Sequence, residues 1–518
     1  MEQSACAAAI EGLARAAFLE LDVPRAMDDW QRAYAAHRSE GGLLGAIRVA
    51  RSLACLYGTV MGDWAVASGW LARAHTLLRD VGESAESGWV ALNSGMFEPD
   101  RPRKELLMRR ALEMAQRYGD TDLEFASLAY LGASLVHDDR TEEGMVLLDE
   151  ALAAVSGDEV EDFFVLEEIF CQLFSACEYA HDVTRADQWI RIGDAIAQRR
   201  NLPAVSAFCR THYGGVLTAA GRWPEADLTL TEAVRLWGLG QRSGLRAGAL
   251  VRLADLRVAQ GRIEDAEQLL RGLDGHGEAA RPLAAVHMAK GQPALARDVL
   301  EHALTELDPL STAAVPLWAL LVEVHLATGL TDEADMAADR LAQCAAARPN
   351  HYVTAVAALA RGRVCLATRT GDPRVCLREA LAGFTRAQLP MELARSRLEL
   401  ANSLAVDRPE AALSEARTAL AAFERLQAAR DVDAATATLR RLGVRPSTAR
   451  QDGGVLTKRE AEVLGLLGHG LSNPEISDRL FISRKTVEHH VGNILAKLGL
   501  RGRAEAAAYA ARQGPARE

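Results

Sequence analysis

A short spacing of small residues recurs along most of this chain. A Gly or another turn-forming residue is followed five positions later by Ala, and often by a second Ala after seven more. The clearest copies are Gly62/Ala67/Ala74, Gly221/Ala226/Ala233, Gly261/Ala266, Gly291/Ala296/Ala303, Gly329/Ala334 and Asp407/Ala412/Ala419. Two helices joined by a tight turn can approach closely only where the facing side chains are small, and Gly can end the first helix in the left-handed conformation. The spacing therefore predicts a series of helical hairpins.

Successive copies, including weaker ones around Ala26, Gly144, Ala186 and Cys376, usually start about forty residues apart. Hairpins stacked with such a period form an α-solenoid whose concave groove binds peptides, proteins or small ligands. We therefore expect an all-α fold with a solenoid over residues 1–442 and an effector of one of these kinds in its groove. A spacer or an oligomerisation scaffold is the alternative.

The copy over residues 209–237 resembles a tetratricopeptide unit, with Gly214, Gly221, Ala226 and Ala233 at the small positions of that signature. The period of about forty residues is longer than that of a tetratricopeptide unit. It is similar to the period of the helical repeats in the superhelical domain of the maltose-regulator family. The resemblance implies stacked helix pairs over most of the chain.

A segment rich in Pro, Ser, Thr and Gly, residues 443–454, follows the last repeat and is typical of a short flexible linker. Two capping boxes come next, Thr457-Lys-Arg-Glu460 and Ser472-Asn-Pro-Glu475. Each predicts a helix start, and the two helices are expected to end near Leu467 and Leu480. The linker therefore marks the boundary of a second domain, residues 455–518.

A third, longer helix is predicted from the cap residue Ser483 onward. Its apolar residues have the i, i+4, i+7, i+11 spacing of a stripe that faces a core, namely Val487, Val491, Ile494 and Leu498. The opposite side carries Lys485, His489, Gly492 and Ala496, flanked by Glu488 and Asn493. Arg484 and Lys485 make its N-terminus cationic. A short helix, a tight turn and a longer helix with a polar outer face form a helix-turn-helix that reads the major groove of double-stranded DNA.

The segment from Leu456 to Ala510 resembles the DNA-binding domain of LuxR-type regulators along its whole length. The matching positions are Leu456, Thr457, Arg459, Glu460, Glu462, Val463, Leu464, Gly470, Leu471, Ser472, Asn473, Glu475, Ile476, Leu480, Ser483, Lys485, Thr486, Val487, His490, Ile494, Lys497, Leu498 and Arg503. The resemblance implies a bacterial four-helix domain that binds DNA as a homodimer. It implies base contacts from Glu488, His489 and Gly492, and phosphate contacts from Lys485, Thr486, Lys497 and Arg501.

Two positions depart from the LuxR-type pattern. Glu488 stands where many relatives have Lys, and its carboxylate repels phosphate but can accept a hydrogen bond from cytosine N4. Gly502 caps the last helix in place of Ser or Thr. The small residues of that helix form either a dimer seam or a contact with the domain's own core: Ala504, Ala507, Ala508 and Ala511.

Charge and cysteine content fit this organisation. The whole chain carries a net charge of −11, but from Gln451 onward ten basic residues outnumber eight acidic ones, a balance of +2, which leaves −13 for the preceding part. The eight Cys residues show no C-x-x-C pair or zinc spacing, as expected of reduced thiols in the cytoplasm. The first residues lack the cationic start of a signal peptide, and the apolar run 312–330 contains Pro316, Glu323 and His325. We expect a cytoplasmic protein without a membrane span.

Several other classes of site are disfavoured. The chain lacks the G-x-x-x-x-G-K-[ST] phosphate loop, so it resembles the rear half of the large ATP-binding LuxR-type regulators without their ATPase. Cys209 and His212 could join a metal or haem site, but a packed pair is favoured. The tryptophans are expected to serve repeat packing rather than a ligand box: Trp30, Trp64, Trp70, Trp189, Trp223, Trp237 and Trp318. No catalytic constellation is assembled from the sequence, so neither an enzyme nor a cofactor or metal is expected.

These patterns together predict a sequence-specific transcription regulator whose helical repeats receive a ligand or a protein. RNA polymerase is a further candidate partner. The alternative is a protein-interaction scaffold that the C-terminal module localises to DNA.

Overall fold

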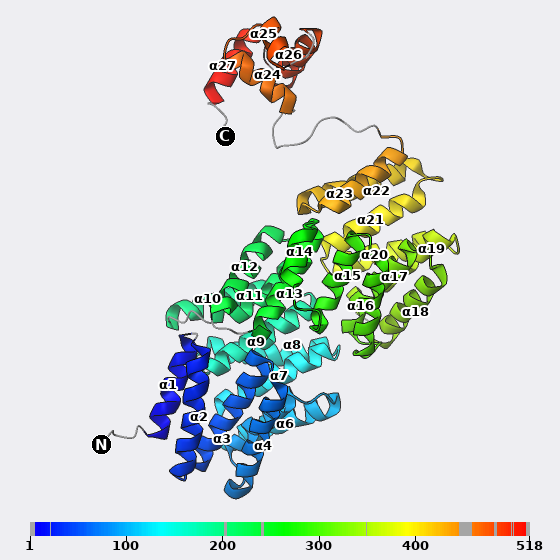
Figure 1. The fold of residues 1–518 in the computed structure, drawn as a ribbon. Coiled ribbons are helices and arrows are strands. Elements are labelled where there is room, and N and C mark those ends of the chain that lie inside the picture. The colour runs from blue at the N-terminus through cyan, green and yellow to red at the C-terminus, as the bar shows by residue number, and fades with distance from the viewer. Residues whose placement is uncertain are drawn as a thin grey trace. The chain divides into compact units, whose positions relative to one another are not determined.

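The computed structural model of the chain describes residues 6–20, 22–200, 205–239, 243–348, 350–444, 458–480, 484–498, 500 and 502–513. Two compact units make up the chain, Met1–Leu442 and Gly443–Glu518. Every regular element within the described ranges is helical (Figure 1). Most of the expected linker, from residue 445 onward, lies outside the described residues, as does Thr457 of the first capping box.

The first unit starts with nine α-helices. They are α1 Ala7–Leu19, α2 Val23–Ser39, α3 Leu43–Cys55 with its π-helical extension η1 Leu56–Met61, α4 Trp64–Val81, α5 Ala85–Met96, α6 Arg101–Tyr118, α7 Thr121–His137, α8 Thr141–Ser156 and α9 Phe163–Ala180.

The same unit continues to α23. The remaining elements are α10 Val183–Arg200, α11 Val205–Ala219, α12 Trp223–Leu239, α13 Ser243–Gln260, α14 Ile263–Leu270, the 3-10 turn η2 Gly277–Ala279, α15 Ala280–Ala289, α16 Pro293–Thr305, the 3-10 turn η3 Thr312–Ala314, α17 Val315–Ala327, α18 Thr331–Ala347, α19 His351–Thr368, α20 Pro373–Arg386, α21 Pro390–Leu404, α22 Pro409–Leu426 and α23 Ala429–Arg441.

Consecutive helices of this unit pack as hairpins, and the hairpins stack in chain order (Figure 1). The pairs include α1–α2, α3–α4, α5–α6, α7–α8, α11–α12, α15–α16, α17–α18, α19–α20 and α21–α22. Alternate helices also touch, as in the series α3, α5, α7, α9, α11, α13, α15, α17, α19, α21 and α23. The predicted tetratricopeptide-like α-solenoid is therefore confirmed.

The turns explain the spacing of small residues. Gly221 has φ +74° between α11 and α12, and Ala226 is fully buried where α12 crosses α11. The same combination occurs at Gly62 and Ala67. The prediction that Gly ends the first helix in the left-handed region is confirmed at these turns.

Two of the weaker copies keep this geometry without Gly. Asp139 and His181 adopt φ +63° and +55°, and the small residues five positions later are Gly144 and Ala186. A Cβ on Gly144 would lie 2.4 Å from the backbone oxygen of Gly132, so only Gly allows α7 and α8 to cross this closely. The left-handed turn is thus maintained even where its residue type is unfavourable.

Successive turns of the solenoid also touch one another. The carboxylate of Asp139 accepts hydrogen bonds from Thr312 Oγ1 at 2.8 Å and Arg348 Nη1 at 3.3 Å, which lie 173 and 209 residues further along the chain. His181 packs on Tyr352 with ring centroids 4.5 Å apart. The superhelix therefore closes on itself rather than remaining an open curve.

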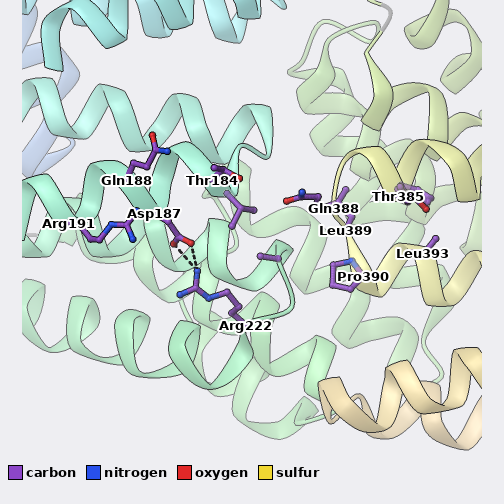
Figure 2. Close-up of a pocket in the computed structure, with 13 residues that line it drawn as sticks. Thr184, Asp187, Gln188, Arg191, Arg222, Thr385, Gln388, Leu389, Pro390 and Leu393 are labelled. Carbon is purple, nitrogen blue, oxygen red and sulfur yellow. Dashed lines mark hydrogen bonds and ion pairs between the residues drawn. The ribbon is translucent and has the colours of Figure 1, made fainter. Parts of the chain in front are cut away.

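A second contact between turns joins α11–α13 to α21–α23. Buried side chains from both sets share one core, among them Trp223, Leu230, Phe423 and Leu426. Beside it lies a pocket of about 590 Å³, with Asp187 and Arg222 on one side and Gln388 and Pro390 on the other (Figure 2). Arg222 Nη1 donates to Asp187 Oδ1 at 2.7 Å.

One segment of the described residues, Leu43–Met61, is long and apolar enough to cross a membrane by length and composition. Within the unit it forms α3 and η1, and its residues Ile47, Val49 and Leu53 are fully buried in the protein core. Burial among protein helices accounts for its apolar character.

The second unit contains four helices, α24 Lys458–Gly468, α25 Asn473–Leu480, α26 Arg484–Leu498 and α27 Arg503–Gln513. Its core is formed by Val463, Leu464, Leu467, Ile476, Val487, Ile494 and Ala506. The predicted small four-helix domain is confirmed.

Candidate DNA-binding surface

The second helix of this domain begins at a capping box. The backbone N–H of Ser472 donates to Glu475 Oε2 at 2.7 Å, and the N–H of Glu475 donates to Ser472 Oγ at 3.5 Å. The hydrogen bonds from Ser472 hold the pKa of Glu475 below its ordinary value. Gly470, at φ +81°, turns the chain between α24 and α25. The predicted cap and turn are both confirmed.

Two arginines tie the short loops to the rest of the domain. Arg459 on α24 donates to the carbonyl oxygen of Leu480, the last residue of α25, at 2.6 Å. Arg503 on α27 donates to Asn473 Oδ1 at 2.6 Å and to the carbonyl oxygen of Leu471. Both ends of α25 are therefore fixed by helices that lie elsewhere in the sequence.

The longest helix, α26, has one buried and one exposed side. Val487 and Ile494 are fully buried, and Val491 and Leu498 pack against the same core as partly buried residues. The predicted apolar stripe is confirmed. Anchored by this stripe, the helix cannot rotate without exposing its core residues.

On the opposite side of α26, the described residues are largely open to solvent within this unit. Arg484, Glu488 and Gly492 are exposed, and Asn493 is half-buried. A Cβ placed on Gly492 would meet no atom within 4 Å. A polar helix face with this much free space can approach a partner without rearrangement of the domain.

The other predicted DNA contacts lie on the same helix or just after it. Lys485, Thr486, His489 and Lys497 belong to α26, but their side chains are outside the described residues. Arg501 lies outside the described residues altogether. The assignment of base and phosphate contacts to these residues stays a prediction.

The last helix contributes to the core and to the surface. Ala506 is fully buried against α24, whereas Ala504 and Ala508 are exposed. Gly502 directly precedes α27, and its carbonyl accepts from Ala506 N at 3.1 Å, as expected of the cap. The exposed alanines leave a small-residue surface on this helix.

Outside this domain, Cys209 and His212 lie on α11. Cys209 is buried, and burial raises the pKa of its thiol well above the ordinary value. His212 Nδ1 lies 2.7 Å from Glu178 Oε2, and Arg252 binds the same carboxylate. In the described ranges, no group of three or more His, Cys, Asp or Glu is arranged to hold a metal ion.

The tryptophans differ in burial, and Trp70 and Trp318 are half-buried. Trp30, Trp189, Trp223 and Trp237 are buried, as expected of repeat packing. Trp64 is instead 58% exposed. The ring of Trp64 nevertheless packs against Phe97, with centroids 5.6 Å apart, so repeat packing stays a prediction at this position.

Sequence reasoning missed several residues that shape these sites. Arg459 and Arg503 were recognised only as matching positions, and their loop contacts depend on helices that meet in space. Asn93 and Glu168 line a cavity in the repeat unit. Single polar residues within long helices carry no spacing signal, so the pattern could not have identified them.

Comparison with solved structures finds distant similarity over most of the chain. A Rap protein complexed with competence and sporulation factor aligns with a TM-score of 0.31 and 14% identity, covering 81% of this chain and 98% of that chain. The APC/C hetero-tetramer Cut9–Hcn1 aligns with a TM-score of 0.39 and 13% identity, covering 98% of this chain and 97% of that chain. At these TM-scores neither similarity says anything further about this chain.

The C-terminal domain has much closer relatives. Transcriptional regulatory protein LnrK of Bacillus subtilis (strain 168) is 52% identical over 59 residues, which are 11% of this chain and 27% of that protein. The DNA-binding transcriptional activator DevR/DosR of Mycobacterium tuberculosis (strain ATCC 25618 / H37Rv) is 49% identical over 55 residues, 11% of this chain and 25% of that protein. The chain thus spans about a quarter of the length of these relatives.

The matched region coincides with the four helices described above. Residues 454–510 match the model of the family described as bacterial regulatory proteins, luxR family. The capping box, the fixed turns and the buried stripe of α26 all fall inside this match. The C-terminal domain of this chain is therefore a helix-turn-helix domain of the luxR family of bacterial regulatory proteins.

Proposed function

We propose that this protein is a cytoplasmic bacterial transcription regulator that binds double-stranded DNA sequence-specifically through α26. The observation that carries the proposal is the two-sided burial of this helix, with Val487 and Ile494 in the core and Arg484, Glu488 and Gly492 exposed. A helix held in this way presents one face to the major groove while its N-terminal N–H groups point toward phosphate.

The individual contacts follow from that placement. Phosphate contacts are proposed for Lys485, Thr486, Lys497 and Arg501. Such contacts determine the position of the protein on the duplex and its affinity, but they do not select a base sequence. Glu488, His489 and Gly492 are proposed to face base edges, with Arg484 and Asn493 on either side. A carboxylate at Glu488 would favour a cytosine, whose N4 amino group donates hydrogen bonds.

The protein is further proposed to bind DNA as a homodimer and to use its repeats as a regulatory region for an effector. The exposed Ala504 and Ala508 of α27 support the first point, since small side chains let two helices approach closely. The cavity and pocket within the repeat unit support the second. RNA polymerase would be the partner through which bound protein alters transcription.

The test starts from duplexes selected by the full-length protein from a randomised pool. Affinity is then measured by mobility shift for the wild type, Lys485→Ala and His489→Ala. We expect Lys485→Ala to weaken binding to all sequences and to reduce the salt dependence by about one unit of slope. His489→Ala should cost about 1–3 kcal/mol on the selected site and relax the preference at one base pair.

Lys290→Ala is the matched control, because it removes one positive charge from the repeat unit, where Lys290 pairs with Glu267 at 2.7 Å. Unchanged affinity of both α26 variants would reject α26 as the recognition helix. Selection of no preferred sequence would reject sequence-specific binding.

A further inference from the structure

Helices α1 to α7 and α9 of the repeat unit surround a cavity of about 630 Å³. Side chains from α1, α2, α3, α5, α6, α7 and α9 line it, together with residues of η1 and α4. Its size is within the range of about 300–1,000 Å³ that is usual for small-molecule sites. Aromatic and charged residues both line the cavity. Their chemistry indicates which class of ligand the cavity can bind.

Aromatic rings supply much of the apolar surface. Trp30 and Phe18 are packed edge to face with ring centroids 5.9 Å apart. Trp64, which is 58% exposed, packs against Phe97 at 5.6 Å, and the Arg51 guanidinium lies 4.3 Å from the ring centre of Trp89. An exposed indole at the wall of a cavity offers a ligand a large apolar surface at little entropic cost.

The arginines of the wall are already neutralised. Arg48 binds Glu11 through two hydrogen bonds of 2.8 Å, and Arg15 binds Asp162 at 2.7 Å. Arg51 pairs with Glu86 at 3.1 Å. These contacts use the guanidinium groups to hold the helices together, so they leave little free positive charge for an anionic ligand.

Glu168 on α9 is the carboxylate that lacks such a partner. Within the described part of the chain, Cys55 Sγ donates to its Oε1 at 3.9 Å, and Glu168 forms no ion pair. Burial raises the pKa of Glu168 to about 7, against the opposing effect of Arg51. A cationic donor brought into the cavity would stabilise the ionised carboxylate.

Asn93 on α5 adds a second acceptor. Its side chain is only 4% exposed, and its Nδ2 donates to Met96 Sδ at 3.3 Å. The Oδ1 atom is buried without a donor in the described structure. A buried carbonyl oxygen without a hydrogen bond destabilises the protein, and a hydrogen bond from a ligand N–H would remove this cost.

We propose that this cavity binds a small amphipathic amine, with an apolar or aromatic body against Trp30 and Trp64 and a protonated amino group that donates to Glu168 and Asn93. The amine neutralises the unpaired carboxylate, and the aromatic faces attract its positive charge. This assignment gives a chemical class to the effector of the regulatory role proposed above, and rests on that role for its biological purpose. Two further cations line the wall: Arg101 pairs with Asp138 at 2.8 Å, and burial lowers the pKa of Lys104.

The test uses the full-length protein and two fluorescent probes that differ in charge. Dansylcadaverine carries an aromatic dansyl group and a primary amine, and its counterpart ends in a carboxylate on a similar alkyl chain. We expect the amine to bind with a blue shift of the dansyl emission and the carboxylate to bind about tenfold more weakly or not at all. Glu168→Gln and Asn93→Ala should each weaken binding of the amine by about tenfold.

Glu161→Gln is the matched control, since Glu161 is an exposed residue just before α9 and lies outside the cavity. Circular dichroism of each variant establishes that it is folded. Equal or tighter binding of the carboxylate probe, an amine affinity that Glu168→Gln leaves unchanged, or no binding of the amine would overturn the proposal. The measurement contains no DNA, so a failure here is separate from a failure of the DNA-binding function.

Discussion

A half-buried carboxylate with a raised pKa makes the stability of the repeat unit depend on pH. Burial raises the pKa of Glu168 from the ordinary carboxyl range to about 7. The folded state therefore holds this proton more tightly than the unfolded chain, and Glu168 destabilises the fold increasingly as pH rises from about 4.5 to about 7. Glu168→Gln removes the ionisable group and leaves a side chain of similar shape.

We expect Glu168→Gln to melt at the same temperature as the wild type at pH 4.5 and on the order of a few degrees higher at pH 8. Thermal unfolding followed by circular dichroism at both pH values measures the difference. Glu161→Gln should show no such divergence. If Glu168→Gln melted at a lower temperature than the wild type at pH 8, ionisation of Glu168 would not destabilise the folded state.

Arg459 on α24 is a single residue that fixes the end of α25, the helix before the proposed recognition helix α26. Its guanidinium donates to the carbonyl of Leu480 at 2.6 Å and pairs with Glu462 at 2.6 Å. Arg459→Ala should lose about 1–3 kcal/mol of local stability, because a charged hydrogen bond to the end of α25 disappears. Amide hydrogen exchange of residues 473–480 should become faster, and affinity for a selected duplex should fall several-fold.

Arg297→Ala provides the comparison for this variant. Arg297 lies on α16 and pairs with Asp298 and Glu301 on the same helix. It should change neither the exchange of α25 nor DNA binding. Unaltered exchange of α25 in Arg459→Ala would show that this hydrogen bond does not hold the turn.

At the scale of elements, the features that could be predicted from the sequence depend on residues only a few positions apart. Gly221 and Ala226 could be assigned to a turn and a helix crossing because both requirements lie within one hairpin. The capping box at Ser472 and the stripe containing Val487 are equally local. These features depend on neighbours a few residues away, and a single sequence displays them directly.

Contacts between distant elements could not be predicted in the same way. The bond from Thr312 to Asp139 depends on the small rotation added by each intervening hairpin. The cavity depends on the same accumulation, since Asn93 and Glu168 belong to separate hairpins. No residue pattern within one repeat encodes the sum of these rotations. Neither the closure of the superhelix nor the cavity could therefore be predicted from the sequence.

That closure can be tested with two glycines of the same type. Gly221 and Gly291 both end a helix with positive φ, +74° and +72°. A Cβ at Gly291 would meet no atom within 4 Å, whereas one at Gly221 would lie 2.7 Å from both Leu426 and Pro390 on the next turn of the superhelix. The two positions therefore share the backbone penalty and differ only in the contact between turns.

Gly291→Ala should destabilise the repeat unit by about 1–2 kcal/mol through its backbone alone. Gly221→Ala should cost about 1–3 kcal/mol more, because the neighbouring turn must move to admit the methyl group. Urea unfolding of both variants, followed by tryptophan fluorescence, gives the comparison. Equal losses of stability would mean that the turns do not pack against each other in solution.

At the scale of the whole molecule, a regulatory role requires that ligand binding to the repeat unit and DNA binding to the C-terminal unit are energetically coupled. A ligand in the repeat cavity can alter DNA binding only if its affinity differs between the free and the DNA-bound protein. The coupling must then be reciprocal, with the ligand changing DNA affinity by the same factor by which DNA changes ligand affinity. Couplings of this kind are typically about 5–150-fold.

We expect saturating dansylcadaverine to change the affinity of the full-length protein for a selected duplex by a factor in this range. The same duplex at saturation should change the affinity for dansylcadaverine by an equal factor. Fluorescence anisotropy of a labelled duplex and the dansyl emission give the two measurements. Glu161→Gln should preserve both effects, whereas Glu168→Gln should require far more probe to produce either. If the probe binds and DNA affinity does not move, the repeats do not regulate the helix-turn-helix domain through this cavity, and the scaffold alternative becomes the better account of the first 442 residues.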